Sequence, residues 1–157
     1  YAPNSIEGMR GLINLGFKII IVTNQSGIAR GFYSEEDFHD LNTWMVSDLL
    51  EKKINIMDVF YCPHHTEAVI AHYREDCFCR KPQPGMFLLA KEKYNLQMNN
   101  CILVGDKESD LLAGMRANVG KLFIVRTGHK IPDSLMNDSF QFLTDVVEFL
   151  KNDSSSS

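Results

Sequence analysis

The segment FKIIIV (residues 17–22) most restricts the fold of this chain, because it is short, β-branched and apolar on both sides. A strand of that composition is typical of a parallel sheet that helices cover on both faces. Three further strand-like segments follow at 57–62, 101–106 and 121–128. Helical segments alternate with these strands, and this order predicts a doubly wound parallel α/β sheet.

The helical segments show apolar residues at helical spacing and recognisable caps. The helix that begins after Ser34 has Asp37 three positions on, which forms a weak capping box, and its apolar residues share one face. The predicted helices cover 4–16, 34–49, 84–94, 109–118 and 140–150. We expect residues 1–150 to form one domain and residues 151–157 to be a disordered tail.

The charge and hydropathy of the chain exclude several kinds of partner. The net charge is −4 and no basic run occurs, so we expect neither a nucleic acid nor an anionic membrane surface to bind. No apolar run reaches the roughly 18–20 residues that span a bilayer, and no signal peptide opens the chain. We therefore expect a cytoplasmic protein, in a reducing compartment where cysteines bind metal more often than they form disulfides.

The segment CPHHTEAVIAHYREDCFC (62–79) offers two closely spaced pairs of metal ligands. Cys62 and His64 form one pair, and Cys77 and Cys79 form the other, which suits a tetrahedral structural zinc without an open position for water. A disulfide or simply buried cysteines are the alternatives. His65 and His72 are further candidate ligands, and spacing alone does not choose between His64 and His65.

Polar side chains also follow the other strands, at the sheet edge where such folds place their sites. The segment VTNQSG (22–27) can present several hydrogen-bond donors to an anion, although an ordinary turn uses the same residue types. In VGDKESD (104–110), Asp106 and Asp110 are suited to Mg²⁺, and the alternative is an acidic helix start. Arg80 and Lys81 follow the cysteine segment directly and suggest a phosphate clamp, with a solvated turn as the alternative.

Together these segments resemble the haloacid dehalogenase superfamily of phosphotransferases. IIIVTN (19–24) looks like its second motif, RKP (80–82) like its third and VGDKESD like its fourth. The longer strings TNQSGIARG (23–31) and CPHH…CFCRKP (62–82) are similar to the D-glycero-D-manno-heptose 1,7-bisphosphate phosphatases and the related histidinol-phosphate phosphatase domain. The resemblance implies a Rossmannoid fold with a zinc-binding loop and no large cap domain.

The resemblance also implies a role for each matching residue. Thr23 would donate to the transferring phosphoryl group, and Lys81 would stabilise its charge. Asp106 would bind Mg²⁺, with Asp110 as a further residue around that site. Cys62, His64, Cys77 and Cys79 would hold the structural zinc, while the substrate would contact Asn24, Gln25, Ser26, Arg80 and Lys107.

One motif of the superfamily does not occur in these 157 residues. It is an Asp-x-Asp pair after a central strand, and its first Asp is the covalent nucleophile. We expect the chain to be part of a longer enzyme whose nucleophile lies upstream of Tyr1; a natural short homologue without catalysis is the alternative. Without that strand, both neighbouring strands should expose apolar surface and unpaired backbone groups.

These observations lead to a magnesium-dependent phosphatase as the expected function. Its substrate would be D-glycero-D-manno-heptose 1,7-bisphosphate, in the synthesis of ADP-heptose for surface glycans such as lipopolysaccharide. A histidinol-phosphate phosphatase is the alternative enzyme, and a non-catalytic zinc-stabilised module is the alternative of a different class. A monomer is the default expectation, since no long heptad pattern or repeat occurs.

Overall fold

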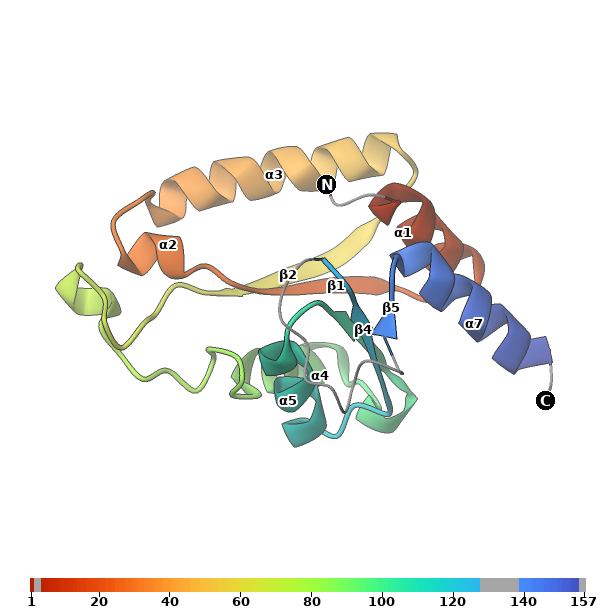
Figure 1. Cartoon of the computed structure of the whole chain (residues 1–157). Helices are drawn as coiled ribbons and strands as arrows, with labels where there is room; N and C mark the ends of the chain where they lie inside the picture. Colours follow the sequence, from red (N-terminus) through yellow and green to blue (C-terminus); the bar gives the residue numbers. More distant parts are fainter. Residues whose placement is uncertain (2–3, 128–138, 156–157) are drawn as a thin grey trace.

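The computed structural model describes residues 1, 4–127 and 139–155 (Figure 1). The loop around His129 lies outside the described residues. The helices are α1 (Ser5–Asn14), α2 (Ser26–Ala29), α3 (Glu35–Glu51), α4 (Gly85–Tyr94), α5 (Glu108–Arg116) and α7 (Leu143–Ser155), with short 3₁₀ turns η1 (Ala71–Tyr73) and η2 (Met98–Asn100). The strands are β1 (Ile19–Asn24), β2 (Ile56–Cys62), β3 (Ile102–Gly105), β4 (Lys121–Val125) and β5 (Ser139–Phe140).

All strand pairs that the structure describes are parallel. β1 pairs with β2, while β3, β4 and β5 form a second sheet in that order. No ladder joins β1 to β3 in the described part of the chain, and every residue of these two strands is only half-buried. Among the described strands, β1 and β3 are each paired along one edge only.

Helices cover both faces of the strands, as a doubly wound fold requires. On one face α1 and α3 pack against β1 and β2, and α7 lies beside α1 over β3 and β4. On the other face α4 and α5 enclose a core of Phe87, Met98 and Ala113 (Figure 1). Val22 and Leu103 both pack against this core, so it joins the two sheets.

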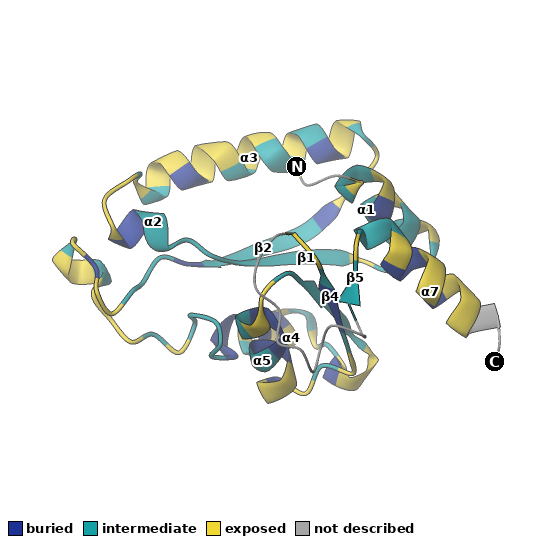
Figure 2. Cartoon of the chain, viewed as in Figure 1, coloured by how far each residue is buried: buried dark blue, intermediate teal, exposed yellow. Residues whose placement is uncertain are grey.

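α3 begins and packs as its sequence dictates, with one difference. The Ser34 hydroxyl accepts from the Asp37 N–H and the Asp37 carboxylate accepts from the Ser34 N–H, which confirms the capping box. Phe38 and Leu49 are buried, whereas Leu41 and Trp44 are 62% and 59% exposed. Figure 2 shows α3 mostly in the colours of exposed and half-buried residues. The apolar face is therefore narrower than the helical spacing predicted.

Two further differences from the predicted elements concern chain ends and turns. α7 extends to Ser155 and so includes residues 151–155 of the segment that was predicted to be a disordered tail. Its buried residues Val146, Val147 and Leu150 fix the helix, and Lys121 pairs with Asp153 at 2.9 Å near its end. The short helix α2 occupies part of the segment read as a polar turn. No helix in the described residues is both long and apolar enough to cross a membrane.

Candidate active site and cysteine cluster

The predicted site residues follow strands whose carboxyl ends point the same way. Thr23 and Asn24 end β1, the cysteine segment leaves β2 at Cys62, and Asp106 follows β3. β1 and β2 run parallel, and Lys81 contacts both Asn24 at the end of β1 and Asp110 in the helix after β3, so these strand ends lie close together. The structure thus places the predicted residues where a ligand would bind in a sheet of this kind.

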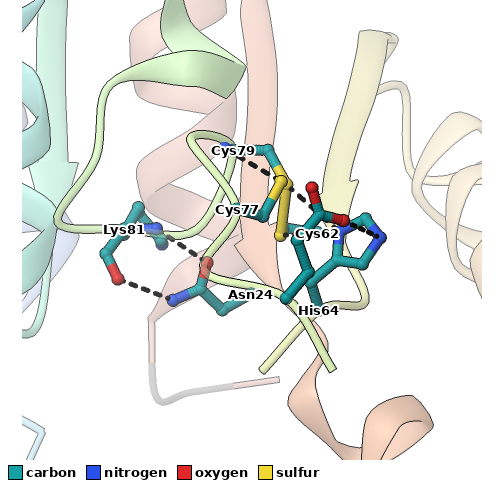
Figure 3. The surroundings of a disulfide bond; sticks show 7 residues. Asn24, Cys62, His64, Cys77, Cys79 and Lys81 are labelled. Carbon is teal, nitrogen blue, oxygen red and sulfur yellow. Dashed lines mark hydrogen bonds and ion pairs between the residues drawn. A yellow bond between two sulfur atoms is a disulfide. The ribbon is translucent and has the colours of Figure 1, made fainter. Parts of the chain in front are cut away.

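Asn24 fastens the turn that carries Lys81. Its amide oxygen accepts from the Lys81 N–H at 3.1 Å, and its amide nitrogen donates to the Lys81 carbonyl at 3.3 Å (Figure 3). Both polar ends of the amide are therefore used on one backbone unit. We call this two-way contact the Asn24 clasp; it fixes where the Lys81 side chain starts.

Lys81 and Asp110 form a buried ion pair. The Lys81 Nζ lies 2.6 Å from the Asp110 Oδ1, with side-chain exposures of 12% and 9%. The Lys81 ammonium also donates to the Val22 carbonyl of β1 at 3.2 Å. An ammonium has three N–H donors, so these two contacts leave one for a ligand oxygen.

Asp110 binds Lys81 and also the backbone of the loop that follows β3. Its Oδ2 accepts from the backbone N–H of Asp106 and of Lys107, each at 3.1 Å. Burial raises the pKa of Asp110, but the hydrogen bond and charge of Lys81, with the two N–H groups, outweigh it and hold that pKa below its ordinary value. Gly105 is required here, since a Cβ on it would lie 2.5 Å from the Asp110 Cβ. Both Asp110 oxygens are thus engaged within the protein.

Thr23 is part of a short hydrogen-bond chain. The Gln25 amide donates to the Thr23 hydroxyl at 3.0 Å, and the Tyr33 hydroxyl donates to the Gln25 oxygen. Tyr33 packs so tightly on Gly27 that a Cβ there would meet the ring. The Thr23 hydroxyl itself donates only a long bond of 3.3 Å to the Asn24 carbonyl, so its proton can turn to a phosphoryl oxygen. Sequence reasoning missed Tyr33, which lies beyond the motif.

The remaining predicted residues lie around this centre. Asp106 is half-buried, and its Oδ2 accepts from the Thr127 hydroxyl at 2.9 Å. Lys107 is exposed just before α5, and Ser26 begins α2. These positions leave Lys107 and Ser26 open to a ligand and keep the Asp106 carboxylate at the strand end.

The cysteine segment brings four ligand atoms to one point. The sulfur atoms of Cys62, Cys77 and Cys79 and a ring nitrogen of His64 all lie within 4.8 Å of one another. The His64 Nδ1 is 3.8 Å from the Cys62 sulfur and 3.7 Å from the Cys79 sulfur. A sulfur and a nitrogen bound to the same zinc lie about 3.6 Å apart, from the usual bond lengths and tetrahedral angles. The donor set and its spacing therefore fit zinc.

The structure also joins Cys62 and Cys79 as a disulfide and leaves Cys77 free (Figure 3). A disulfide and a zinc site exclude each other at these two sulfurs, because zinc binds thiolates. The disulfide accounts for two of the four atoms and gives no reason for the Cys77 sulfur and the His64 nitrogen to converge on the same point. The geometry of the full set consequently favours zinc.

His64, rather than His65, belongs to the cluster. The His64 Nε2 lies 3.3 Å from the Glu75 carboxylate, which leaves Nδ1 to face the sulfurs. A carboxylate on the far ring nitrogen is the usual way to orient a metal-binding histidine. The Nδ1 of His65 accepts from the Glu67 N–H at 2.9 Å, away from the cluster.

A tyrosine–glutamate contact ties the segment to α3. The Glu35 carboxylate accepts from the hydroxyls of Tyr61 and Tyr73, each at 2.6 Å. The hydrogen bond from Tyr61, followed by that from Tyr73, holds the pKa of Glu35 below its ordinary value. Burial and the hydrogen bond to Glu35 raise the pKa of Tyr61 to about 12. Tyr73 lies in the middle of the cysteine segment, so Glu35 anchors it to the end of β2.

Loss of the Asn24 clasp should lower the stability of the protein by a measurable amount. We expect Asn24→Ala to lower the free energy of unfolding by about 2 kcal/mol, since two backbone groups of Lys81 lose their partners. Asn42→Ala is the matched control, because the Asn42 amide oxygen is buried without a hydrogen-bond partner among the described residues. Urea denaturation measures both changes, and equal losses in the two variants would show that the clasp contributes nothing of its own.

The fold and this site together define a hydrolase of the haloacid dehalogenase class, with Thr23 at the end of β1, Lys81 in the loop before α4 and Asp106 after β3. The family model described as HAD-hydrolase-like matches residues 78–150. The chain is 44% identical over 137 residues to the D-glycero-alpha-D-manno-heptose-1,7-bisphosphate 7-phosphatase of Photorhabdus laumondii, covering 87% of this chain and 75% of that protein. The chain therefore belongs to the D-glycero-D-manno-heptose-1,7-bisphosphate 7-phosphatase family.

Further comparisons agree with this assignment. The D-glycero-beta-D-manno-heptose-1,7-bisphosphate 7-phosphatase of Escherichia coli K12 is 42% identical over 143 residues, which cover 91% of this chain and 75% of that protein. The crystal structure of D,D-heptose 1,7-bisphosphate phosphatase from B. bronchiseptica, complexed with magnesium and phosphate, superposes with a TM-score of 0.80 and 26% identity. That match covers 96% of this chain and 83% of the other.

Proposed function

We propose that this chain carries the phosphate-binding half-site of a magnesium-dependent phosphatase acting on D-glycero-D-manno-heptose 1,7-bisphosphate. The observation that carries the proposal is the buried Lys81–Asp110 pair, set beside Thr23 by the Asn24 clasp. Family membership supports the substrate, which the relatives' names give as the heptose bisphosphate. The product would enter the synthesis of ADP-heptose for surface glycans.

Lys81 and Thr23 would bind the phosphoryl group that is removed. The third N–H of Lys81 and the Thr23 hydroxyl are both donors at the strand edge, and the transferring phosphoryl group spreads its negative charge over three oxygens. Donors fixed in advance stabilise that charge without reorganising during the reaction. Asp110 and Asn24 act through Lys81 and are positioning residues.

Asp106 would hold Mg²⁺. Its carboxylate is half-buried at the strand end, where it accepts from the Thr127 hydroxyl, and Mg²⁺ takes one or two protein carboxylates with several waters. When bound, Mg²⁺ supplies positive charge to the phosphoryl oxygens. Arg80, Lys107, Gln25 and Ser26 line the substrate in this proposal.

Cys62, His64, Cys77 and Cys79 would hold a structural zinc. Four protein ligands complete its tetrahedral shell, so the zinc braces the segment and takes no part in the chemistry. Because Arg80 and Lys81 follow Cys79 directly, the zinc site would determine where these two cations lie. Thiolate ligands suit the reducing cytoplasm, which we propose as the location of the protein.

A phosphate-release assay tests the proposed function. No Asp-x-Asp pair occurs in these 157 residues, so the assay uses the protein as encoded, with whatever residues flank this sequence. We expect Mg²⁺-dependent release from heptose 1,7-bisphosphate, in the α or the β form, with kcat/KM at least about 100-fold above that for histidinol phosphate. Phosphorus NMR should show that the phosphate on carbon 1 remains.

Two outcomes would contradict the proposal. A preference for histidinol phosphate would assign the protein to the alternative enzyme. Bound zinc without any phosphatase activity toward either substrate would support the non-catalytic module. Chelation of Mg²⁺ with EDTA, followed by its return, checks that activity depends on that metal.

A further inference from the structure

Glu35 joins two tyrosines that have no part in the reaction proposed above. It is half-buried in the first turn of α3, where its Oε1 accepts from the Tyr61 hydroxyl and its Oε2 from the Tyr73 hydroxyl, each at 2.6 Å. Hydrogen bonds to an ionised acceptor are stronger than those between neutral groups. We call the three side chains the Glu35 tie; it uses both carboxylate oxygens.

The Tyr61 end of the tie fixes the strand end that carries Cys62. Tyr61 directly precedes Cys62, and the two residues close β2. The Tyr61 ring also packs against Phe38 of α3, with ring centroids 4.7 Å apart. Both the ring and the hydroxyl of Tyr61 therefore contact α3, which limits the movement of the backbone that presents the Cys62 sulfur.

The Tyr73 end of the tie fixes His64 through the backbone. The Tyr73 carbonyl accepts from the His65 N–H at 3.0 Å, and the Glu75 N–H donates to the His65 carbonyl at 3.3 Å. Residues 73–75 thus run beside His65, and their Glu75 carboxylate lies 3.3 Å from the His64 Nε2. The Glu75 side chain is 59% exposed, so its place beside His64 depends on the backbone that Tyr73 anchors.

We propose that Glu35 is a positioning residue for the zinc site, which holds Cys62 through Tyr61 and His64 through Tyr73 and so slows the loss of the ion. The inference rests on the structural zinc of the proposed function and deepens it. A ligand that is held in place rebinds the ion before a second ligand opens. Partners that orient metal ligands for this reason affect metal affinity without touching the metal.

The first test is the rate of zinc release from Glu35→Gln, measured on the protein as encoded with an excess of a chromogenic chelator. We expect release about 10-fold faster than in the wild type, at the lower end of the effects of such partners, because Glu35 acts through the two tyrosines. Glu36→Gln is the matched control. It removes the same charge from the same helix turn, and Glu36 is exposed, so its zinc should leave at the wild-type rate.

A double variant tests whether Glu35 acts through Tyr73. Tyr61 is less suitable for this purpose, because its hydroxyl also lies 3.2 Å from the His39 Nε2. We expect Tyr73→Phe to speed zinc release, and the double variant with Glu35→Gln to release zinc less than about twofold faster than Glu35→Gln alone. Independent, multiplying effects would overturn the proposal, as would equal release from Glu35→Gln and Glu36→Gln.

Hydrogen exchange reads the cysteine segment without zinc release or substrate. The His65 and Glu75 N–H groups should exchange roughly 10-fold faster in Glu35→Gln, the effect of one lost charge-assisted hydrogen bond. The Lys107 N–H, which Asp110 holds at the other site, should exchange at the wild-type rate. Equal acceleration at all three groups would indicate a general loss of stability and would overturn the positioning role.

The remaining outcomes separate this inference from the proposed function. Co²⁺ in place of zinc has a visible spectrum that reports ligand geometry; Glu35→Gln should shift it, and an unchanged spectrum would contradict a positioning role. A wild-type protein that holds no zinc would refute the structural zinc and the role of Glu35 in retaining it. A protein that holds zinc but lacks phosphatase activity would refute the enzyme assignment alone, since zinc release still decides on Glu35.

Discussion

Asp110→Asn is expected to lower the free energy of unfolding by about 3–5 kcal/mol at pH 7, since it leaves the Lys81 ammonium buried without its counter-charge. Loss of the pair should also lower kcat by at least about 100-fold, because the donor that meets the phosphoryl group is no longer held in place. Urea denaturation and steady-state kinetics on the protein as encoded measure the two effects. Asparagine keeps the size of the side chain, so the change isolates the charge.

Glu148→Gln is the control for Asp110→Asn. It makes the same carboxylate-to-amide change in an exposed pair, in which Lys151 lies 3.2 Å from Glu148. Such surface pairs contribute about 0–1 kcal/mol, so we expect little effect on stability and none on activity. A loss of similar size in both variants would show that burial of the Lys81–Asp110 pair has no special importance.

The same pair predicts a dependence of stability on pH. The pKa of Asp110 is lower in the folded protein than its ordinary value, so the unfolded chain binds more protons at acidic pH. The stability that the pair supplies is thus present above the unfolded pKa of about 4 and is lost as pH falls through the folded value. Between pH 7 and 3, the wild-type protein should lose more stability than Asp110→Asn. Parallel acid profiles would contradict this.

Cys77→Ser is expected to release the zinc and to destabilise the cysteine segment as strongly as Cys62→Ser or Cys79→Ser. A structural zinc contributes folding energy directly, and removal of one thiolate breaks its tetrahedral shell. The wild-type protein should contain one zinc per chain by elemental analysis, and the variants should contain much less. Their melting temperatures should fall by roughly 5 °C or more, which corresponds to losses above 1 kcal/mol.

The choice of Cys77 separates zinc from the disulfide. A disulfide joins only Cys62 and Cys79, so under that arrangement Cys77→Ser would leave the bond intact and the stability almost unchanged. Cys101→Ser is the control, because Cys101 is a free cysteine outside the cluster whose sulfur contacts the Gln97 carbonyl. Full retention of stability in Cys77→Ser, with two fewer titratable thiols than cysteines in the unfolded wild type, would establish the disulfide.

The order of strands and helices was predictable because hydrophobic periodicity and caps are local properties. FKIIIV became β1 with a shift of two residues, and the Ser34–Asp37 capping box formed as expected. Motif positions after strand ends were also predictable, since a parallel sheet brings those ends to one edge. These features depend on a few adjacent residues and need no knowledge of packing.

Contacts between distant segments could not be read from the sequence. Asn24 appeared as a substrate residue, yet its amide is used on the backbone of Lys81, 57 positions away. Sequence reasoning placed Asp110 around the magnesium site and could not show that its oxygens accept from Lys81 and two backbone N–H groups. Spacing could not choose between His64 and His65, because the choice depends on how the loop folds back on Cys77 and Cys79.

The contacts of Lys81 cross the boundary between the two sheets. Its backbone is held by Asn24 on β1, whereas its ammonium is balanced by Asp110 on α5, which packs against β3 and β4. Both contacts of this one lysine can form only when the two sheets are in one arrangement relative to each other. A phosphorylated ligand that binds this lysine should therefore reduce the motion of both sheets, including residues far from the site.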